Sequence, residues 1–244
     1  MKLAHNPFSA LNDSGIACGF SNRENGNMSL SYGNTKGALE NRQSFLSSLG
    51  INYKDLVCAK QVHSNRVQYV RDSDRTRGAL GYEDSIPGTD GFITDARNLP
   101  LAIFTADCLS VFLYDSRKPA IGLLHAGWRS SKENIVSCAI NLMRSKFSTD
   151  PADLFAGFGP SIRSCCYEVS VEFKDNFSFG LIESSGRIYL DLAEVNKKQL
   201  FDSGVKKENI FDSGICAYCD SNDFFSFRRE KEVAGRMISV IALR

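Results

Sequence analysis

Short apolar segments separated by polar residues fill the middle of this 244-residue chain. The longest apolar stretch, residues 99–114, is interrupted by Asp107 and Cys108 and is shorter than the ~20 residues that a membrane-spanning helix needs. Segments of this length and composition are typical of buried β-strands. We therefore predict strands over residues 56–61, 66–71, 91–95, 101–105, 109–114, 120–124, 154–158, 188–190 and 237–243.

Helical patterns alternate irregularly with these strands. Helices are predicted over residues 37–49, from the capping-box pattern Ser130-Ser131-Lys132-Glu133 onward, over 169–177, and from Asp191 to about residue 201. The polar residues 72–89 predict a long surface loop of the kind that can cover a site. No internal repeat, linker, or Rossmann or P-loop glycine pattern is found. The sequence thus predicts a single α+β domain with mixed sheets, spanning residues 1–244.

Charge and cysteine content favour an intracellular protein with a small-molecule site. The 29 Lys+Arg against 28 Asp+Glu leave a net charge of +1, which gives no overall basic footprint for nucleic acid or an anionic membrane. The N-terminal residues 1–7 are polar and lack the apolar run of a signal peptide. The eight cysteines are therefore expected to be reduced thiols in a cytoplasmic protein, a monomer or a small homo-oligomer.

His63, Cys108 and His125 are candidate metal ligands, because each lies at a turn or strand end beside a predicted buried strand. Two imidazoles and one thiolate with an open fourth position are typical of a catalytic zinc site. The spacing leaves two alternatives open: a buried structural cysteine with unrelated histidines, or a metal-free Cys–His nucleophilic pair. The remaining histidine, His5, is expected at the surface. The one C-x-x-C pattern, at residues 216–219, has no second pair of that pattern and is expected to be structural or incidental.

Six short motifs occur together between residues 61 and 229. They are Gln61-Val62-His63, Thr89-Asp90-Gly91, Thr105-Ala106-Asp107-Cys108, His125-Ala126-Gly127-Trp128-Arg129, Gly159-Pro160-Ser161-Ile162 and Phe225-Ser226-Phe227-Arg228-Arg229. From about Gly19 onward the chain resembles the YfiH/YlmD family, which is catalogued as laccase-domain multicopper polyphenol oxidase, purine nucleoside phosphorylase or peptidoglycan editing factor. The resemblance implies an α/β/β/α layered fold and one zinc ion on His63, Cys108 and His125. It also implies phosphorolysis of adenosine, inosine and methylthioadenosine, with some adenosine deamination.

The chain departs from the family pattern at three places, none of them a predicted metal ligand. Arg163-Ser164 stands where the family often has Gly-Pro, Ser130 replaces a usual glycine, and the N-terminal Gly-Val-Ser motif is reduced to Gly26-Asn27-Met28-Ser29. The substrate preference could therefore differ. Three histidines are too few for a trinuclear copper cluster plus a blue copper centre, so a multicopper oxidase is excluded. A single copper ion remains possible, because the two-histidine, one-cysteine set also suits copper.

Phosphorolysis gives the neighbouring residues candidate roles. Arg129, Arg228 and Arg229 are candidate contacts for phosphate or ribose, because guanidinium binds phosphate with two hydrogen bonds. The alternative is that these arginines form structural or surface ion pairs. Asp107, beside the thiolate of Cys108, is a candidate acid/base group, an orienter of the metal ligand, or a turn residue.

Two other functions remain open from the sequence. One is hydrolysis by a zinc-activated water, either of adenosine at C6 or, as the peptidoglycan-editing label suggests, of an amide. The cytidine-deaminase signature is absent, so deamination would need another site design. The other function is non-catalytic binding, in which His63 and Cys108 would be packing residues and the purified protein would hold no stoichiometric metal.

Overall fold

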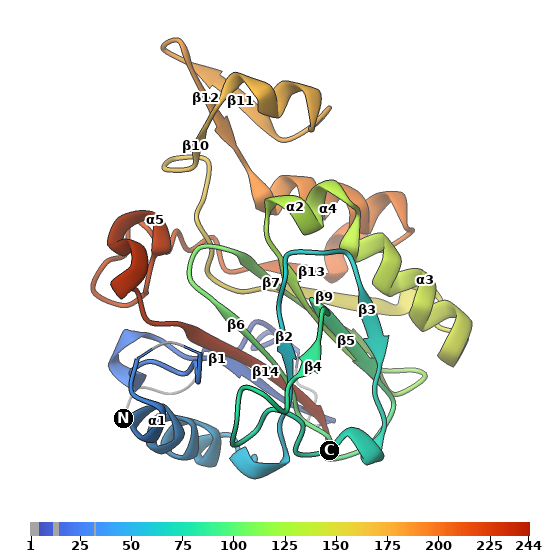
Figure 1. Cartoon of the computed structure of the whole chain (residues 1–244). Coiled ribbons are helices and arrows are strands. Elements are labelled where there is room, and N and C mark those ends of the chain that lie inside the picture. Colours follow the sequence, from blue (N-terminus) through green and yellow to red (C-terminus); the bar gives the residue numbers. More distant parts are fainter. Residues whose placement is uncertain (1–4, 12–14, 32) are drawn as a thin grey trace.

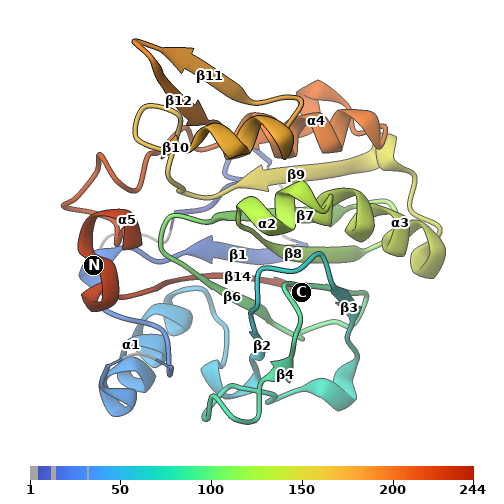
Figure 2. The ribbon, with the colours of Figure 1, turned by 45° about the horizontal axis from the view of Figure 1, so that its top comes forward.

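Two β-sheets pack face to face at the centre of the computed structural model, which describes residues 5–11, 15–31 and 33–244 (Figures 1 and 2). The five-stranded sheet has the order β1 (Ile16–Phe20), β14 (Met237–Leu243), β6 (Leu101–Thr105), β2 (Val57–Lys60) and β4 (Ile86–Pro87). The six-stranded sheet has the order β13 (Ile210–Asp212), β9 (Leu154–Phe158), β7 (Leu109–Asp115), β8 (Ala120–Ala126), β5 (Gly91–Thr94) and β3 (Val67–Tyr69). In both sheets, parallel pairs such as β2–β6 and β13–β9 stand beside antiparallel ones, so the predicted mixed sheets are confirmed.

Alternating side chains on the strands divide the core into layers. In β6, Leu101 and Ile103 join the core between the two sheets, whereas Ala102 packs toward α1 (Thr35–Ser48). In β7, Phe112 enters the same inter-sheet core, while the side chains on either side of it face the helices α3 (Ile135–Phe147) and α4 (Leu192–Asp202). This two-residue period is the property of a strand buried on both faces. The result is the expected α/β/β/α arrangement, which Figure 2 shows.

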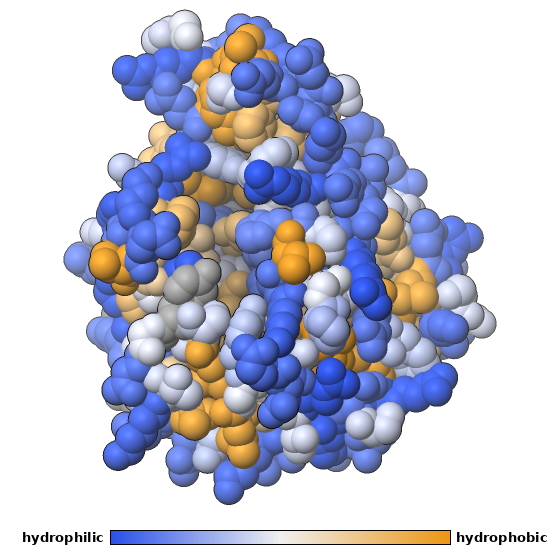
Figure 3. All heavy atoms as spheres, in the orientation of Figure 1, coloured by the Kyte–Doolittle hydropathy of each residue, from blue (hydrophilic) through white to orange (hydrophobic). Residues whose placement is uncertain are grey.

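A small three-stranded sheet, with the order β10 (Glu168–Val169), β12 (Arg187–Leu190) and β11 (Leu181–Ser184), lies beyond α2 (Trp128–Lys132) and α4 (Figure 1). Neither β10 nor β11 was predicted from the sequence, and the helix expected over residues 169–177 is only the 3-10 turn Val171–Asp175. Apolar side chains reach the surface over this sheet at the top of Figure 3. Val171 is 66% exposed, whereas Phe177 is buried and Phe173 packs beside it, so only part of the apolar pattern that suggested a helix here contributes to the core.

The helix after β8 begins earlier than the capping-box pattern indicated. The amide of Ser131 bonds to the carbonyl of Gly127 (2.8 Å), so α2 (Trp128–Lys132) starts at Trp128 with Gly127 as its N-cap. Ser130 is consequently a buried residue inside the helix, and the predicted cap is wrong. Asn134 then takes a left-handed conformation (φ 60°) and separates α2 from α3.

The remaining elements are short. Asp191 caps α4 as predicted, through its carboxylate to the amide of Glu194 (3.1 Å), and Ser226 caps α5 (Phe227–Glu230). Further 3-10 turns lie at Arg23–Asn25, Tyr53–Asp55, Asp72–Asp74, Pro151–Asp153, Lys207–Asn209 and Lys231–Val233. Residues 1–4 of the polar N-terminal segment lie outside the described residues. Within residues 5–11, 15–31 and 33–244, no helix combines the length and apolar character that crossing a membrane requires.

An ion-pair group at the end of β13 predicts that the free energy of unfolding decreases in acid. Burial alone would raise the pKa of Asp212, but two hydrogen bonds from Arg163 and the ammonium of Lys197 (3.0 Å) outweigh it and lower the pKa to about 2. The folded state then holds fewer protons than the unfolded state between about pH 4 and pH 2, so this stabilisation exists above pH 4 and is lost as the pH falls.

Asp212→Asn is therefore expected to lower the free energy of unfolding at pH 7 by about 2 kcal/mol, and by progressively less below pH 4. Urea unfolding at several pH values measures this difference. Asp202→Asn is the control, because Asp202 is 59% exposed and pairs only with the half-exposed Lys198 at the surface of α4. Equal effects of the two substitutions at pH 7 would contradict the prediction.

Candidate metal centre and cleft

The fold brings His63, Cys108 and His125 together. His63 lies after β2, Cys108 immediately before β7, and His125 near the end of β8, which pairs with β7. The Sγ of Cys108 lies 3.7 Å from the Nε2 of His63, and the ligand atoms of all three residues lie within 4.8 Å of one another. Zinc–sulfur and zinc–nitrogen bonds in a tetrahedral site place the two atoms about 3.6 Å apart. These three side chains can therefore hold a metal ion. The third histidine, His5, is half-buried and stacks on Phe20, contrary to the expected surface position.

The backbone around these ligands is strained. His63 and Asp107 have φ values of 62° and 87°, in the left-handed region that residues other than glycine rarely occupy. Gly127 packs so closely that a Cβ atom there would lie 2.8 Å from a carbon of the His63 ring and 3.0 Å from the sulfur of Cys108. Strain of this kind collects at functional sites, where the surrounding structure enforces it.

Asp90 positions two of the three ligands. Its Oδ1 accepts hydrogen bonds from the backbone N–H of His63 (2.9 Å) and from Nδ1 of His125 (2.8 Å). Its Oδ2 accepts from the amides of Val62 (3.2 Å) and Ser64 (2.7 Å). Because Nδ1 of His125 donates to Asp90, the other ring nitrogen, Nε2, is left as the metal-binding atom. Asp90 lies in the Thr89-Asp90-Gly91 motif, but nothing in the sequence alone indicated this positioning role.

The electrostatics of the site favour a thiolate. Burial acts to raise the pKa of Cys108, but the charge and hydrogen bonds of His125 and His63 lower it to about 6. Burial acts to lower the pKa of His125, yet attraction to Cys108 and the bond to Asp90 raise it to about 9. Asp90 is itself penalised by burial, but His125 and Ser64 keep its pKa below the ordinary value. Cys108 is thus held in the ionised form that binds metals.

All three ligands line one cleft with a volume of about 500 Å³. The lining also includes Tyr82 and Ser85 of the predicted loop over residues 72–89, so this loop borders the site. The aromatic side chains that line the cleft are Tyr82, Phe104, Trp128, Tyr167 and Phe227, and the basic ones are Arg42, Arg129, Arg228, Lys231 and Arg236. The cleft therefore offers flat apolar surfaces for a ring and cationic groups for an anion next to the candidate metal centre.

Asp107 also lines this cleft, beside Cys108. Its Oδ2 accepts a hydrogen bond from the backbone N–H of Arg228 (2.6 Å), while its Oδ1 is buried and has no hydrogen-bond partner among the described residues. Burial raises the pKa of this carboxyl group, and Arg228 offsets only part of the rise. Asp107 is thus a carboxyl group suited to holding a proton in the cleft.

Of the three arginines predicted to contact phosphate or ribose, only two line the cleft. Arg129 lines the cleft with its guanidinium 4.2 Å from the ring centre of Trp128. Arg228 also lines it, and its guanidinium lies 5.1 Å from the ring of Tyr167. Arg229 lies outside the cleft lining, because its guanidinium bonds to the carbonyls of Ala217, Tyr218 and Phe224 and to Glu230.

Three further basic residues, Arg42, Lys231 and Arg236, line the cleft and were not singled out from the sequence. Arg42 is only 1% exposed and donates to the carbonyls of Met28 and Ala79, so it fixes the wall where α1 meets the loop over residues 72–89. No local pattern marks such a residue, because its partners lie far away in the sequence.

Comparison with known proteins identifies the family of this chain. The family model described as "Multi-copper polyphenol oxidoreductase laccase" matches residues 16–244. A protein of Bacillus subtilis (strain 168) named "Purine nucleoside phosphorylase YlmD" is 33% identical over 214 residues, covering 84% of this chain and 77% of its own length. A protein of an unknown prokaryotic organism named "Adenosine deaminase RL5" is 30% identical over 212 residues, covering 83% and 80%. The crystal structure of Bacillus licheniformis hypothetical protein YfiH superimposes with a TM-score of 0.89 at 32% identity, covering 94% and 93%.

The fold and the match over residues 16–244 define a protein of the laccase-like class. More particularly, the chain belongs to the YfiH/YlmD family, as its motifs indicated. The several copper ions implied by the family description do not fit the ligands of this chain. It has only three histidines, and one of them, His5, packs against Phe20.

Proposed function

We propose that this protein is a zinc-dependent purine nucleoside phosphorylase, which transfers the pentose of adenosine, inosine or methylthioadenosine to phosphate. The proposal rests on one observation. His63, Cys108 and His125 lie together in the lining of a cleft whose walls also carry aromatic and cationic side chains. The names of the YlmD relatives support the reaction class. Three protein ligands with a fourth position toward the cleft are the arrangement of catalytic zinc sites.

Phosphorolysis requires a site that stabilises two developing charges, one on the sugar and one on the base. A phosphate oxygen bonds to C1′ of the sugar as the C1′–N9 bond breaks, and the bonding electrons leave with the purine. The sugar becomes more positive and the base more negative in the transition state, as in other glycosidic cleavages. The guanidinium groups of Arg129 and Arg228 would hold the phosphate. The rings of Trp128 and Tyr167 would flank the purine.

Asp107 is the candidate proton donor to the departing base. Its raised pKa favours the protonated form, and its Oδ1, which is not engaged in another hydrogen bond among the described residues, would carry the proton. The amide of Arg228 fixes the other oxygen, which sets the direction of Oδ1. When bound, zinc supplies a Lewis acid that stabilises negative charge on an oxygen or nitrogen of the reactants.

Separation of the purine products tests this proposal. Zinc-loaded protein is incubated with adenosine, with and without phosphate, and the products are resolved by chromatography. We expect adenine only where phosphate is present. Inosine in both reactions would favour a deaminase, the activity in the name of one relative. Unchanged adenosine would contradict both nucleoside functions and favour amide hydrolysis.

The position of Arg129 predicts a specific kinetic effect. Arg129→Met is expected to raise the KM for phosphate about 10-fold or more and to change the KM for adenosine less, since a charge-assisted bond contributes about 1.5–3 kcal/mol. Arg117→Met is the matched control, because Arg117 is 75% exposed and pairs with Asp153 on the surface. An unchanged KM for phosphate in Arg129→Met would remove Arg129 from the phosphate site.

A further inference from the structure

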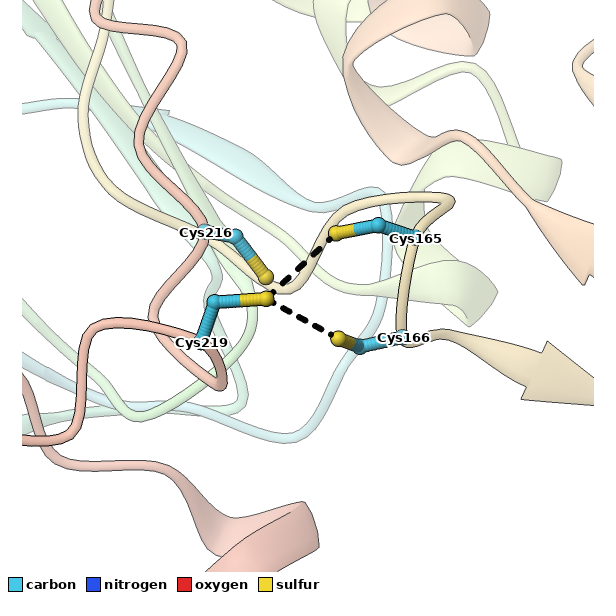
Figure 4. A group of neighbouring side chains, drawn as sticks. All are labelled: Cys165, Cys166, Cys216 and Cys219. Carbon is cyan, nitrogen blue, oxygen red and sulfur yellow. Dashed lines mark hydrogen bonds between the residues drawn. The ribbon is translucent and has the colours of Figure 1, made fainter.

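Four cysteines from two separate loops meet outside the catalytic cleft. Cys165 and Cys166 lie between β9 and β10, and Cys216 and Cys219 follow β13. The Sγ of Cys219 lies 3.7 Å from that of Cys165 and 3.2 Å from that of Cys166, and all four sulfur atoms lie within 4.8 Å of one another. Figure 4 shows the four side chains pointing toward one another from opposite sides. The C-x-x-C pattern therefore has a partner pair, which the sequence analysis did not recognise.

The spacing of the sulfur atoms suits a shared metal ion. Four sulfurs bonded to zinc at about 2.3 Å in a tetrahedron lie about 3.8 Å apart. The observed separations are close to this value and require only small side-chain rotations to match it. Four thiols crowded at this distance without an ion would offer one another only weak hydrogen bonds.

The backbone holds the two loops in register. Ser161 forms an isolated parallel bridge with Cys216, and the amide of Ala217 donates to the carbonyl of Ser161 (3.0 Å). Arg163 crosses between the loops, with Nε donating to the carbonyl of Ile215 (3.2 Å) and two further bonds to Asp212. The cysteines are thus preorganised by contacts that do not involve their own side chains.

We propose that Cys165, Cys166, Cys216 and Cys219 bind one structural zinc ion. Binding replaces the thiol protons, which pass to solvent, and involves no change of oxidation state. Four protein ligands close the coordination shell, so this ion would brace the structure rather than bind substrate. None of the four cysteines lines the catalytic cleft, and the site is therefore distinct from His63, Cys108 and His125.

The position of the cluster indicates what the ion would brace. Tyr167, which follows Cys166, lines the catalytic cleft and contacts Arg228. Ala217 and Tyr218, between the other two cysteines, accept hydrogen bonds from Arg229. The zinc would thus tie the loop that carries Tyr167 to the loop that anchors α5.

Metal counting in matched variants tests the proposal. Wild type and the single variants Cys108→Ser, Cys165→Ser, Cys219→Ser and Cys138→Ser are purified under reducing conditions, and zinc per chain is measured by emission spectroscopy. We expect Cys108→Ser to retain one zinc. Cys165→Ser and Cys219→Ser should each contain one zinc fewer than wild type. Cys138→Ser should match wild type, because Cys138 lies on α3 away from both groups.

Cobalt spectra of Cys108→Ser, in which all four cysteines of the cluster are intact, give a readout that does not depend on how the cluster variants fold. Cys108→Ser loaded with Co²⁺ should show strong thiolate-to-cobalt absorption and the visible bands of a tetrahedral ion, and Cys108→Ser/Cys219→Ser should lose them. A Cys108→Ser protein without zinc and without cobalt bands would overturn the proposal. A disulfide between the two loops, found by mass spectrometry of the unreduced protein, would overturn it as well. These outcomes leave the catalytic proposal untouched, because that proposal depends on the metal lost in Cys108→Ser.

Discussion

Cys108→Ser is expected to remove the metal of the proposed catalytic centre and, with it, the turnover of adenosine. The substitution replaces a thiolate, held ionised by His125 and His63, with a hydroxyl that is neutral at pH 7 and binds zinc poorly. Loss of an outer contact alone lowers metal affinity about 10–100-fold, so loss of the sulfur ligand should exceed ~100-fold. Zinc affinity is measured by competition with a chromophoric chelator, and turnover by release of adenine.

The matched control for this prediction is Cys138→Ser, a half-buried cysteine on α3 that belongs to neither cysteine-containing group. It should keep wild-type affinity and turnover. A Cys108→Ser enzyme with full activity would show that the reaction does not depend on the metal centre, and the proposed mechanism would then be wrong.

Asp90→Asn is expected to weaken metal binding about 10–100-fold while the fold is retained. Each carboxylate oxygen of Asp90 accepts at least two hydrogen bonds: Oδ1 from His63 and His125, and Oδ2 from the amides of Val62 and Ser64. An asparagine has only one acceptor oxygen, so in either orientation its NH₂ group faces N–H donors. The loop of His63 or the ring of His125 must then shift. Zinc competition measures the loss, and circular dichroism checks the fold.

Asp95→Asn provides the comparison for Asp90→Asn, because Asp95 is exposed and accepts a hydrogen bond from the hydroxyl of Tyr69 (2.7 Å) away from the cleft. Zinc affinity should be unchanged in this variant. If both variants bind zinc as tightly as wild type, Asp90 does not position the ligands.

Much of the fold follows from local sequence patterns. The apolar runs that became β6, β7, β8 and β14 are buried along their whole length or nearly so, and short apolar runs bounded by polar turns are typical of strands buried on both faces. The starting point of α2 could not be predicted in the same way. The helix begins where the carbonyl of Gly127 accepts from Ser131, because the strand delivers the chain there, and a capping pattern three residues later does not outweigh that constraint.

The candidate site likewise contains some residues that the sequence indicates and others whose roles only the tertiary fold determines. His63, Cys108 and His125 could be singled out, because imidazole and thiolate at strand ends carry a recognisable chemistry. The role of Asp90 depends on which amides face it, and the separation of Arg229 from Arg129 depends on carbonyls contributed by another loop. The meeting of Cys165 and Cys166 with Cys216 and Cys219 joins segments about 50 residues apart. Contacts of this kind arise from the tertiary fold, and spacing along the chain does not encode them.

The fate of the sugar tests the central claim most directly. Zinc-loaded protein is mixed with adenosine and inorganic phosphate, and the reaction is followed by phosphorus-31 nuclear magnetic resonance, with Cys108→Ser as the blank. Phosphorolysis predicts a new sugar-phosphate signal that grows in step with free adenine and is absent from the blank. Adenine without any sugar phosphate, or inosine in place of adenine, would contradict it.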